Sequence, residues 1–222
     1  MIDIIAIDGP AGSGKSTVAE LLARRLGYAY IDTGAMYRAL TLKAMREGLD
    51  LRDEEKIARL SMETKLDIVP DALGGISVML DNEDVASLIR TPELTENVSC
   101  IAKVAAVRQR MKDIQRSIGA RGKAVFEGRD IATVVFPKSR FKFYIDADFN
   151  ERVNRRYREL ISKGVDISRE DVDRDLKIRD HKDITRKIGP LKVADGAIVI
   201  DTTRMTIDEV ADRLQGYITA CF

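Results

Sequence analysis

The chain has 222 residues, 45% of them hydrophobic, and its 37 basic side chains nearly balance its 36 acidic ones. This length suits one large domain, and the near-neutral charge gives no general reason to expect nucleic acid or an anionic membrane as partner. One histidine, His181, and two cysteines without metal-ligand spacing, Cys100 and Cys221, argue against a zinc site or a Ser-His-Asp triad. Any site for an anion must therefore be built locally.

The ends and the hydropathy of the chain indicate a cellular location. The N-terminus enters the apolar run IDIIAI without a preceding basic segment, and no uncharged stretch has the length of a membrane span. Two thiols without a disulfide framework fit a reducing compartment. We therefore expect a cytoplasmic protein that binds neither membrane nor nucleic acid, and a monomer by default.

Short apolar runs recur along the chain between amphipathic segments. Such runs are typical of strands that are buried on both faces of a parallel sheet. They lie at residues 2–7, 28–31, 123–127, 141–145 and 197–200. Their alternation with helical patterns predicts an α/β fold, a doubly wound five-stranded parallel sheet with helices on both faces.

Helical patterns flank these runs, and two stretches interrupt the alternation. Residues 15–26 and 206–219 have apolar side chains at helical spacing, the second after a capping box of Thr206 and Glu209. Residues 64–90 contain KLDIV and GISVMLD around the turn-forming PDALGG, which predicts a small β insertion, followed by helix signals over 91–118. Residues 149–187 are densely charged and helical, with a stop at Gly189-Pro190.

The strongest motif is GPAGSGKS at residues 9–16, which matches G-x-x-x-x-G-K-[ST] between a predicted strand and a predicted helix. Its glycines let the backbone N–H groups curl around phosphate oxygens at the positive end of the new helix. Lys15 can reach the β- and γ-phosphates, and the Ser16 hydroxyl can ligate Mg²⁺. The motif predicts a nucleoside triphosphate site made of Gly9, Pro10, Ala11, Gly12, Ser13, Gly14, Lys15, Ser16 and Thr17, which is an ATP site if the chain is a kinase.

Three classes of nucleotide-binding protein remain open: a GTPase-type switch, an ATPase motor and a small-molecule kinase. TKLD (64–67) and DALG (71–74) match the guanine-reading strings of a GTPase, but in reversed order and inside the predicted β insertion. A motor would be larger or would carry an oligomerisation module. A kinase fits best, and its acceptor is either an alcohol, which needs a base, or a phosphate, which needs only charge neutralisation.

Arginines occur where a phosphate acceptor would need them. DTGAMYR (32–38) and EGRD (127–130) follow the second and third predicted strands, at the carboxyl edge where such sheets bind ligands. Further arginines crowd residues 150–158. In IRDHKDITR (178–186), the spacing of Arg179, Asp183 and Arg186 at i, i+4 and i+7 predicts one stripe on a helix.

These segments together resemble the bacterial type of cytidylate kinase over nearly the whole chain. The resemblance implies a P-loop fold with a helical lid and MgATP-dependent phosphorylation of CMP, and of dCMP, to the diphosphate. It is carried by GPAGSGKST (9–17), DTGAMYR (32–38), VSCIAKVAAVR (98–108), EGRDIATVVFP (127–137), RRY (155–157) and RDHKDITR (179–186).

The resemblance also implies residue roles for the acceptor. Thr33, Arg38 and Arg129 would hold the CMP phosphate; Ser99, Arg108 and Asp130 would read cytosine; Arg179, Asp183 and Arg186 would hold ribose, phosphate and base. In the expected mechanism an oxygen of CMP, held between the 32–38 turn and the β insertion, attacks in line without a base. The predicted catalytic residues are Lys15, Arg38, Arg129, Arg179, Arg152 and Arg156.

The predicted organisation is one kinase unit built from three parts. The core comprises 1–37, 119–148 and 188–222, the monophosphate-binding part is 38–118, and 149–187 forms the lid and acceptor-binding segment. The alternatives that the sequence leaves open are a kinase for UMP or for an alcohol such as shikimate or gluconate, and a non-catalytic nucleotide-dependent switch.

Overall fold

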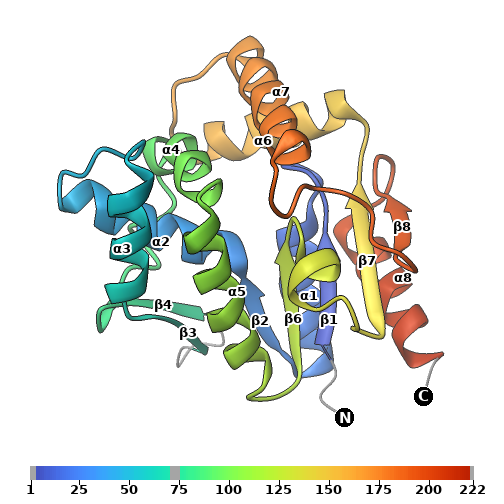
Figure 1. Ribbon diagram of the computed structural model, residues 1–222. Helices are drawn as coiled ribbons and strands as arrows, with labels where there is room; N and C mark the ends of the chain where they lie inside the picture. Colours follow the sequence, from blue (N-terminus) through green and yellow to red (C-terminus); the bar gives the residue numbers. More distant parts are fainter. Residues whose placement is uncertain (1–3, 71–75, 221–222) are drawn as a thin grey trace. The chain divides into compact units, whose positions relative to one another are not determined.

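A computed structural model describes residues 4–70 and 76–220 (Figure 1). Five strands form one sheet in the order β2-β6-β1-β7-β8, and the pairs β1–β7 and β7–β8 are parallel. Their bounds are Ile4–Asp8 (β1), Ala29–Asp32 (β2), Ala124–Gly128 (β6), Phe141–Asp146 (β7) and Ile198–Asp201 (β8). The predicted α/β fold class is confirmed, and each strand end that can be compared lies within one residue of its predicted position.

The chain divides into two compact units, which are described separately. The phosphate-loop unit comprises residues 4–28 and 125–222, and the inserted unit comprises residues 29–124. No helix within the described ranges combines the length and the apolar character that a bilayer crossing requires.

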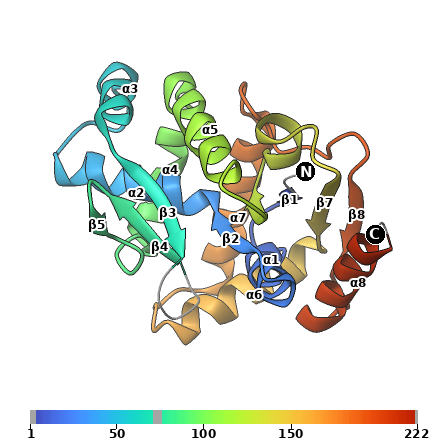
Figure 2. The same ribbon diagram turned by 90° about the horizontal axis from the view of Figure 1, so that it is seen from below.

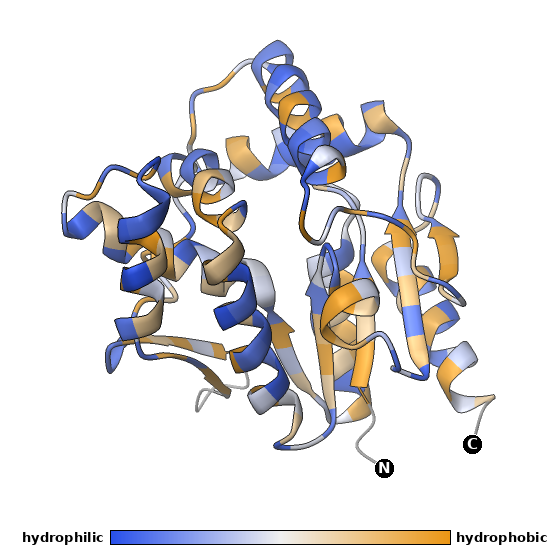
Figure 3. Ribbon diagram, viewed as in Figure 1, coloured by the Kyte–Doolittle hydropathy of each residue, from blue (hydrophilic) through white to orange (hydrophobic). Residues whose placement is uncertain are grey.

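In the phosphate-loop unit, helices cover the sheet on both faces. Helices α1 (Lys15–Leu26) and α8 (Ile207–Thr219) lie on one face, and the π-helical turn η1 (Ile131–Val135) lies on the other (Figures 1 and 2). All five residues of β1 are buried, and Phe126 and Phe143 are among the largest fully buried side chains. Apolar colours accordingly concentrate in these strands in Figure 3.

The charged segment forms two helices, α6 (Phe149–Ser162) and α7 (Arg169–Thr185). Ser168 caps α7 by accepting a hydrogen bond from the Asp171 N–H. Because α7 ends at Thr185, the predicted stripe is wrong for Arg186, which lies just past the helix with φ −57° and ψ 132°. The capping box that starts α8 is present as predicted.

The inserted unit contains a small antiparallel sheet and four helices among its described residues. Strands β3 (Leu66–Pro70) and β4 (Ile76–Leu80) pair as predicted, with Ile68 opposite Val78. Of the predicted turn segment PDALGG (70–75), Pro70 is the last residue of β3, and 71–75 lie outside the described residues. A short third strand, β5, was not predicted. The other elements are α2 (Thr33–Arg46), α3 (Glu54–Glu63), β5 (Glu83–Asp84), α4 (Pro92–Ala102) and α5 (Ala105–Gly119).

The prediction of a turn at residues 32–38 is wrong. Asp32 is instead the N-cap of α2, because its carboxylate accepts the N–H of Ala35 across 3.0 Å. A carboxylate in this position satisfies one of the donors that a helix leaves unpaired at its start. Thr33 and Arg38 therefore stand on the first two turns of a helix.

Candidate active site

The phosphate loop joins β1 to α1 and is held close to its neighbours. Gly12 and Gly14 have φ of 76° and 84°, in the left-handed region that glycine adopts without steric cost. A Cβ at Gly9 would overlap the carbonyl oxygen of Ile145, and one at Gly12 would lie 2.8 Å from the Arg152 carbonyl oxygen. The loop backbone is thus fixed by packing before any ligand binds.

Lys15 opens α1 with its ammonium group turned back along the loop. The residue is 5% exposed, and Nζ donates to the Pro10 carbonyl across 3.2 Å. Burial, followed by the nearby charges of Arg129 and Arg179, lowers the pKa of Lys15 from 10.5 to about 7, against the opposing effect of Glu127. The positive charges of Lys15, Arg129 and Arg179 therefore interact with one another near the start of α1.

Glu127 is a site residue that the sequence reasoning missed. It lies near the end of β6, where its Oε1 accepts the Ser16 hydroxyl across 2.6 Å and its Oε2 lies 3.9 Å from Lys15 Nζ. The sequence signal for it is an acidic residue, the first of EGRD (127–130), at the carboxyl end of the strand beside the phosphate-loop strand.

The pair of Ser16 and Glu127 suits a magnesium ion. Both offer oxygen ligands, which Mg²⁺ prefers, and the two oxygens already lie within 2.6 Å of each other. Within residues 4–70 and 76–220 no group of three or more His, Cys, Asp or Glu side chains could hold a metal. Such a site would therefore take its remaining ligands from water and substrate phosphates, as is common for Mg²⁺.

Asp8, at the end of β1, is buried and unusual in its chemistry. Its two carboxylate oxygens accept the N–H groups of Ile131 and Ala132 at 2.9 and 2.8 Å. Burial raises the pKa of Asp8 to about 7, although these two hydrogen bonds favour the ionised form. Asp8 thereby fixes the start of η1, directly after Arg129 and Asp130. Asp130 itself is buried.

Asp183 joins two of the predicted arginines. Arg129 Nε donates to its Oδ2 across 2.8 Å, and Arg186 Nη1 lies 3.8 Å from its Oδ1. Although burial alone would raise the pKa of Asp183, the charges of Arg129 and Arg179 lower it, so the carboxylate stays ionised. The structure thus brings together Lys15, Arg129, Arg179, Asp183 and Arg186 in the phosphate-loop unit.

Three arginines on α6 differ in their surroundings. Arg156 pairs with Glu159 at 2.8 Å. Arg155, which was not selected as a site residue, reaches the Ser13 carbonyl at 3.3 Å and the Thr202 carbonyl at 2.7 Å. Arg152 is the most buried of the three and pairs with Asp180 of α7.

In the inserted unit, Arg38 pairs with the helix cap that precedes it. Its Nη2 donates to Asp32 Oδ2 across 2.6 Å, and Thr33 between them in sequence is buried. Although burial would raise the pKa of Asp32, the Arg38 charge and the Ala35 N–H lower it. Asp32 is the first residue of the motif DTGAMYR, but the motif alone does not show that its carboxylate orients Arg38.

The predicted cytosine-reading residues of the inserted unit lie on consecutive helices. Ser99 on α4 donates to the Glu96 carbonyl at 3.5 Å. Arg108 on α5 is buried, donates to the Ala102 carbonyl at 3.2 Å, and lies 5.8 Å above the ring of Tyr37. Arg108 is therefore not an exposed helix residue, because its guanidinium is buried and is held over an aromatic ring.

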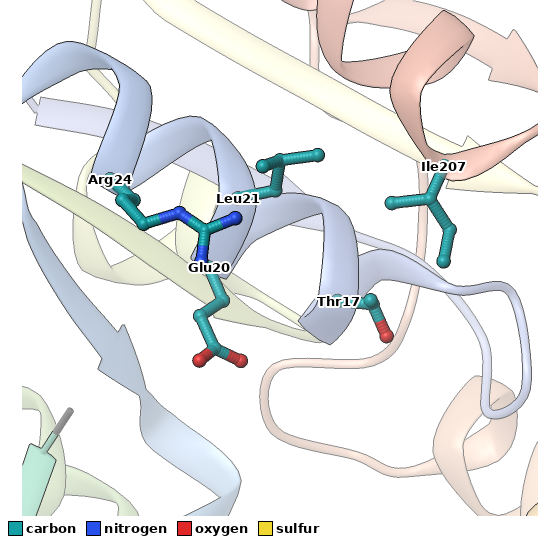
Figure 4. A pocket seen from close by; sticks show the side chains of 5 residues that line it. All are labelled: Thr17, Glu20, Leu21, Arg24 and Ile207. Atoms are coloured by element: carbon teal, nitrogen blue, oxygen red, sulfur yellow. The ribbon is translucent and has the colours of Figure 1, made fainter.

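A shallow groove of about 250 Å³ runs along α1 from Thr17 (Figure 4). Leu21 and Ile207 supply its apolar walls, and Glu20 and Arg24 lie at its charged side. Thr17 is the last predicted ATP-binding residue, so the groove adjoins the phosphate loop.

Comparison with known proteins places the chain among nucleotide kinases. A family model described as cytidylate kinase matches residues 5–220. Similar proteins named cytidylate kinase include those of Caldanaerobacter subterraneus subsp. tengcongensis, 47% identical, and Carboxydothermus hydrogenoformans, 46% identical. Each alignment covers 95% of this chain and 92% or 94% of the relative.

Solved structures share the fold at low identity. An uncharacterized protein from Eubacterium ventriosum has a TM-score of 0.53 at 16% identity, and shikimate kinase from Bacteroides thetaiotaomicron has 0.51 at 11%. Both alignments cover 99% of each chain. These likenesses concern the fold alone.

Proposed function

Because the chain belongs to the cytidylate kinase family, we propose that it transfers the γ-phosphoryl group of ATP to CMP, and to dCMP, giving ADP and the cytidine diphosphate. The observation that carries the proposal is the crowding of positive charge at Lys15. Burial and the charges of Arg129 and Arg179 lower the pKa of that lysine, while Glu127 and Asp183 oppose them, so three cations lie near one position of the phosphate loop. A polyphosphate is the ligand that such a group of cations suits.

The chain's residues would divide the work of the reaction. Lys15 and the N–H groups at the start of α1 hold the transferring end of ATP, with Gly9 to Thr17 as its binding loop. Arg129 and Arg179 neutralise charge on both phosphates, and Asp183 keeps Arg129 oriented. Arg156 is also proposed to act on the transferring group. Ser16 and Glu127 would hold magnesium, which would add charge neutralisation at the phosphate oxygens.

The acceptor needs no general base in this scheme. A CMP phosphate oxygen is already an anion, so the obstacle is the repulsion between two phosphates, and arginines remove it. Arg38 and Thr33 are proposed to bind that phosphate, with Asp32 orienting Arg38. Ser99, Arg108, Asp130 and Arg186 are proposed to recognise the rest of CMP.

One assay tests the proposal. The purified protein is supplied with MgATP and, separately, CMP, dCMP, UMP, AMP, shikimate and gluconate, and ADP release is followed through coupled enzymes. We expect turnover with CMP and dCMP and at least about tenfold lower kcat/KM with the other acceptors. Turnover of shikimate or gluconate alone would support an alcohol kinase, and nucleotide binding without any acceptor turnover would support a switch.

The finer description of the protein's setting is also a proposal. Its composition, with balanced charge and two cysteines, suits a monomer that works in the cytoplasm. Light scattering on the purified chain tests the first part, and a mass of about twice 24.8 kDa would contradict it.

A further inference from the structure

Arg152 and Asp180 form an ion pair between two helices of the phosphate-loop unit. Arg152 lies on the first turn of α6, and Asp180 lies on the last turns of α7. Arg152 Nη1 donates to Asp180 Oδ2 across 2.6 Å, and the two side chains are 9% and 14% exposed. The pair is therefore largely removed from solvent.

Arg152 also contacts the phosphate loop, the residue after β7, and the last residue of that strand, with Nε 3.9 Å from Asp146 Oδ1. Nη1 also donates to the Ala11 carbonyl at 3.1 Å, and Nε donates to the Ala147 carbonyl at 3.2 Å. Its guanidinium carbon lies 5.1 Å above the Phe149 ring, and its carbonyl is the group that a Cβ at Gly12 would meet. The loop thus lies directly against this one residue.

Packing ties the same elements together. The Ala11 side chain belongs to a buried apolar cluster with Val153 and Leu160 of α6 and with Val172 and Leu176 of α7. The phosphate loop, α6 and α7 therefore share one small core. A shift of α7 would move both this core and the guanidinium that binds the Ala11 carbonyl.

Asp180 stands on α7 between two predicted site residues. Arg179 precedes it, and Asp183, which binds Arg129, follows one turn later. The charges of Arg179 and Asp183 both act on Lys15. Asp180 is therefore linked to the phosphate loop through Arg152, while its neighbours Arg179 and Asp183 act on Lys15 at the end of that loop.

Stability alone explains this pair poorly. A buried ion pair gains little over apolar side chains of similar size, because both charges must be desolvated. In addition, Asp180 Oδ1 is buried and accepts no hydrogen bond from any residue that the structure describes. A buried acceptor without a partner costs free energy. The pair therefore contributes little to the stability of the fold, and its main effect is to fix the positions of the two side chains and of the helices that carry them.

We infer that Arg152 and Asp180 are positioning residues, which hold the Arg179–Asp183 end of α7 in register with the phosphate loop. The inference rests on the proposed phosphoryl transfer. It gives Arg152 a different role from the predicted contact with phosphate, because its guanidinium donates to Ala11, Ala147 and Asp180.

The experiment compares Asp180→Ala and Asp180→Asn with Asp173→Ala. Asp173 lies on the same helix and pairs with Lys177, so Asp173→Ala removes an ion pair that does not involve the phosphate loop. Steady-state kinetics with ATP and CMP are measured well below the melting temperature of every variant. Because a misplacement of about 1 Å can cost a factor of about 100, we expect Asp180→Ala to lower kcat about 10- to 100-fold.

The other two variants show whether position is the cause. The amide oxygen of Asp180→Asn can still accept from Arg152, so this variant should recover part of the lost kcat, and Asp173→Ala should stay within about twofold of the parent. The inference is overturned if the folding Asp180 variants keep kcat within about twofold and lose only melting temperature. Should Asp180→Ala fail to fold, Asp180→Asn alone decides by the same criterion. A parent enzyme that does not phosphorylate CMP would instead refute the proposed function.

Discussion

The Ser16 hydroxyl donates to Glu127 Oε1 across 2.6 Å, and this bond joins the phosphate loop to the end of the neighbouring strand. The same carboxylate lies 3.9 Å from Lys15 Nζ. Glu127 therefore contacts two residues of the phosphate-loop motif, although it lies outside that motif and is not an arginine.

Replacement of this carboxylate tests its role. Glu127→Gln removes the charge, keeps the shape, and should lower kcat about 100-fold while raising the Mg²⁺ concentration needed for half-maximal rate. The measurement is a magnesium titration of the rate at saturating ATP and CMP. Glu20→Gln, an exposed change on α1, serves as control and should leave both values unchanged. An unaltered magnesium requirement in Glu127→Gln would separate this residue from the metal.

Gly12 and Gly164 have the same φ but different surroundings, so substitutions there distinguish the effect of backbone strain from that of a steric contact. Gly12 and Gly164 both have φ of 76°, but a Cβ at Gly12 would lie 2.8 Å from the Arg152 carbonyl oxygen, whereas one at Gly164 would meet nothing within 4 Å. Gly164→Ala should cost about 1–2 kcal/mol of stability and leave kinetics unchanged. Gly12→Ala should cost more and lower kcat/KM for ATP at least about tenfold, because the loop must move. Urea unfolding and kinetics measure both effects, and equal stability losses would show that contact with Arg152 does not constrain the loop.

The lowered pKa of Lys15 predicts a pH dependence of stability in the nucleotide-free protein. Its folded pKa is about 7 and its ordinary value is 10.5, so between these values the unfolded chain binds one proton that the folded chain does not. Stability should therefore rise with pH in this window, by at most about 1.4 kcal/mol per pH unit. Lys15→Met lacks this contribution. Urea unfolding of both proteins at about pH 6 and about pH 9 checks it, and a stability difference that does not change with pH would contradict the lowered pKa.

The fold was predictable largely because buried parallel strands are apolar on both faces. Runs such as IDIIAI and AIVI therefore predicted the strand ends to within one residue wherever the two can be compared. Strand β5 escaped because it consists of two exposed acidic residues, Glu83 and Asp84, with no apolar signal. The helix at α7 was recognised from its charges, but its end before Arg186 depends on contacts such as that of Arg186 Nε with the Gly189 carbonyl.

The site was predictable where a local motif carries the chemistry, as at Lys15 and Ser16. Residues that act through distant partners were missed. Asp8 shows no function in sequence until the chain brings it to Ala132, 124 positions away, and Asp180 needs Arg152, 28 positions away. Arginine-rich segments indicated the cations from the sequence. Their carboxylate partners, Asp32 beside Arg38 and Glu127 beside Lys15, are evident only in the structure.

The most direct test of the account is the turnover number of Arg179→Ala with ATP and CMP, measured together with its melting temperature. The Arg179 charge disfavours the charged form of Lys15 and favours that of Asp183, so these effects oppose each other and its removal should leave the melting temperature nearly unchanged. Because two phosphates must meet in its field, kcat should fall about 100-fold or more. Arg174→Ala, which removes an exposed pair with Asp171 on the same helix, should keep full activity. A kcat within about twofold of the parent in Arg179→Ala, or a loss matched by the control, would contradict phosphoryl transfer driven by converging arginines.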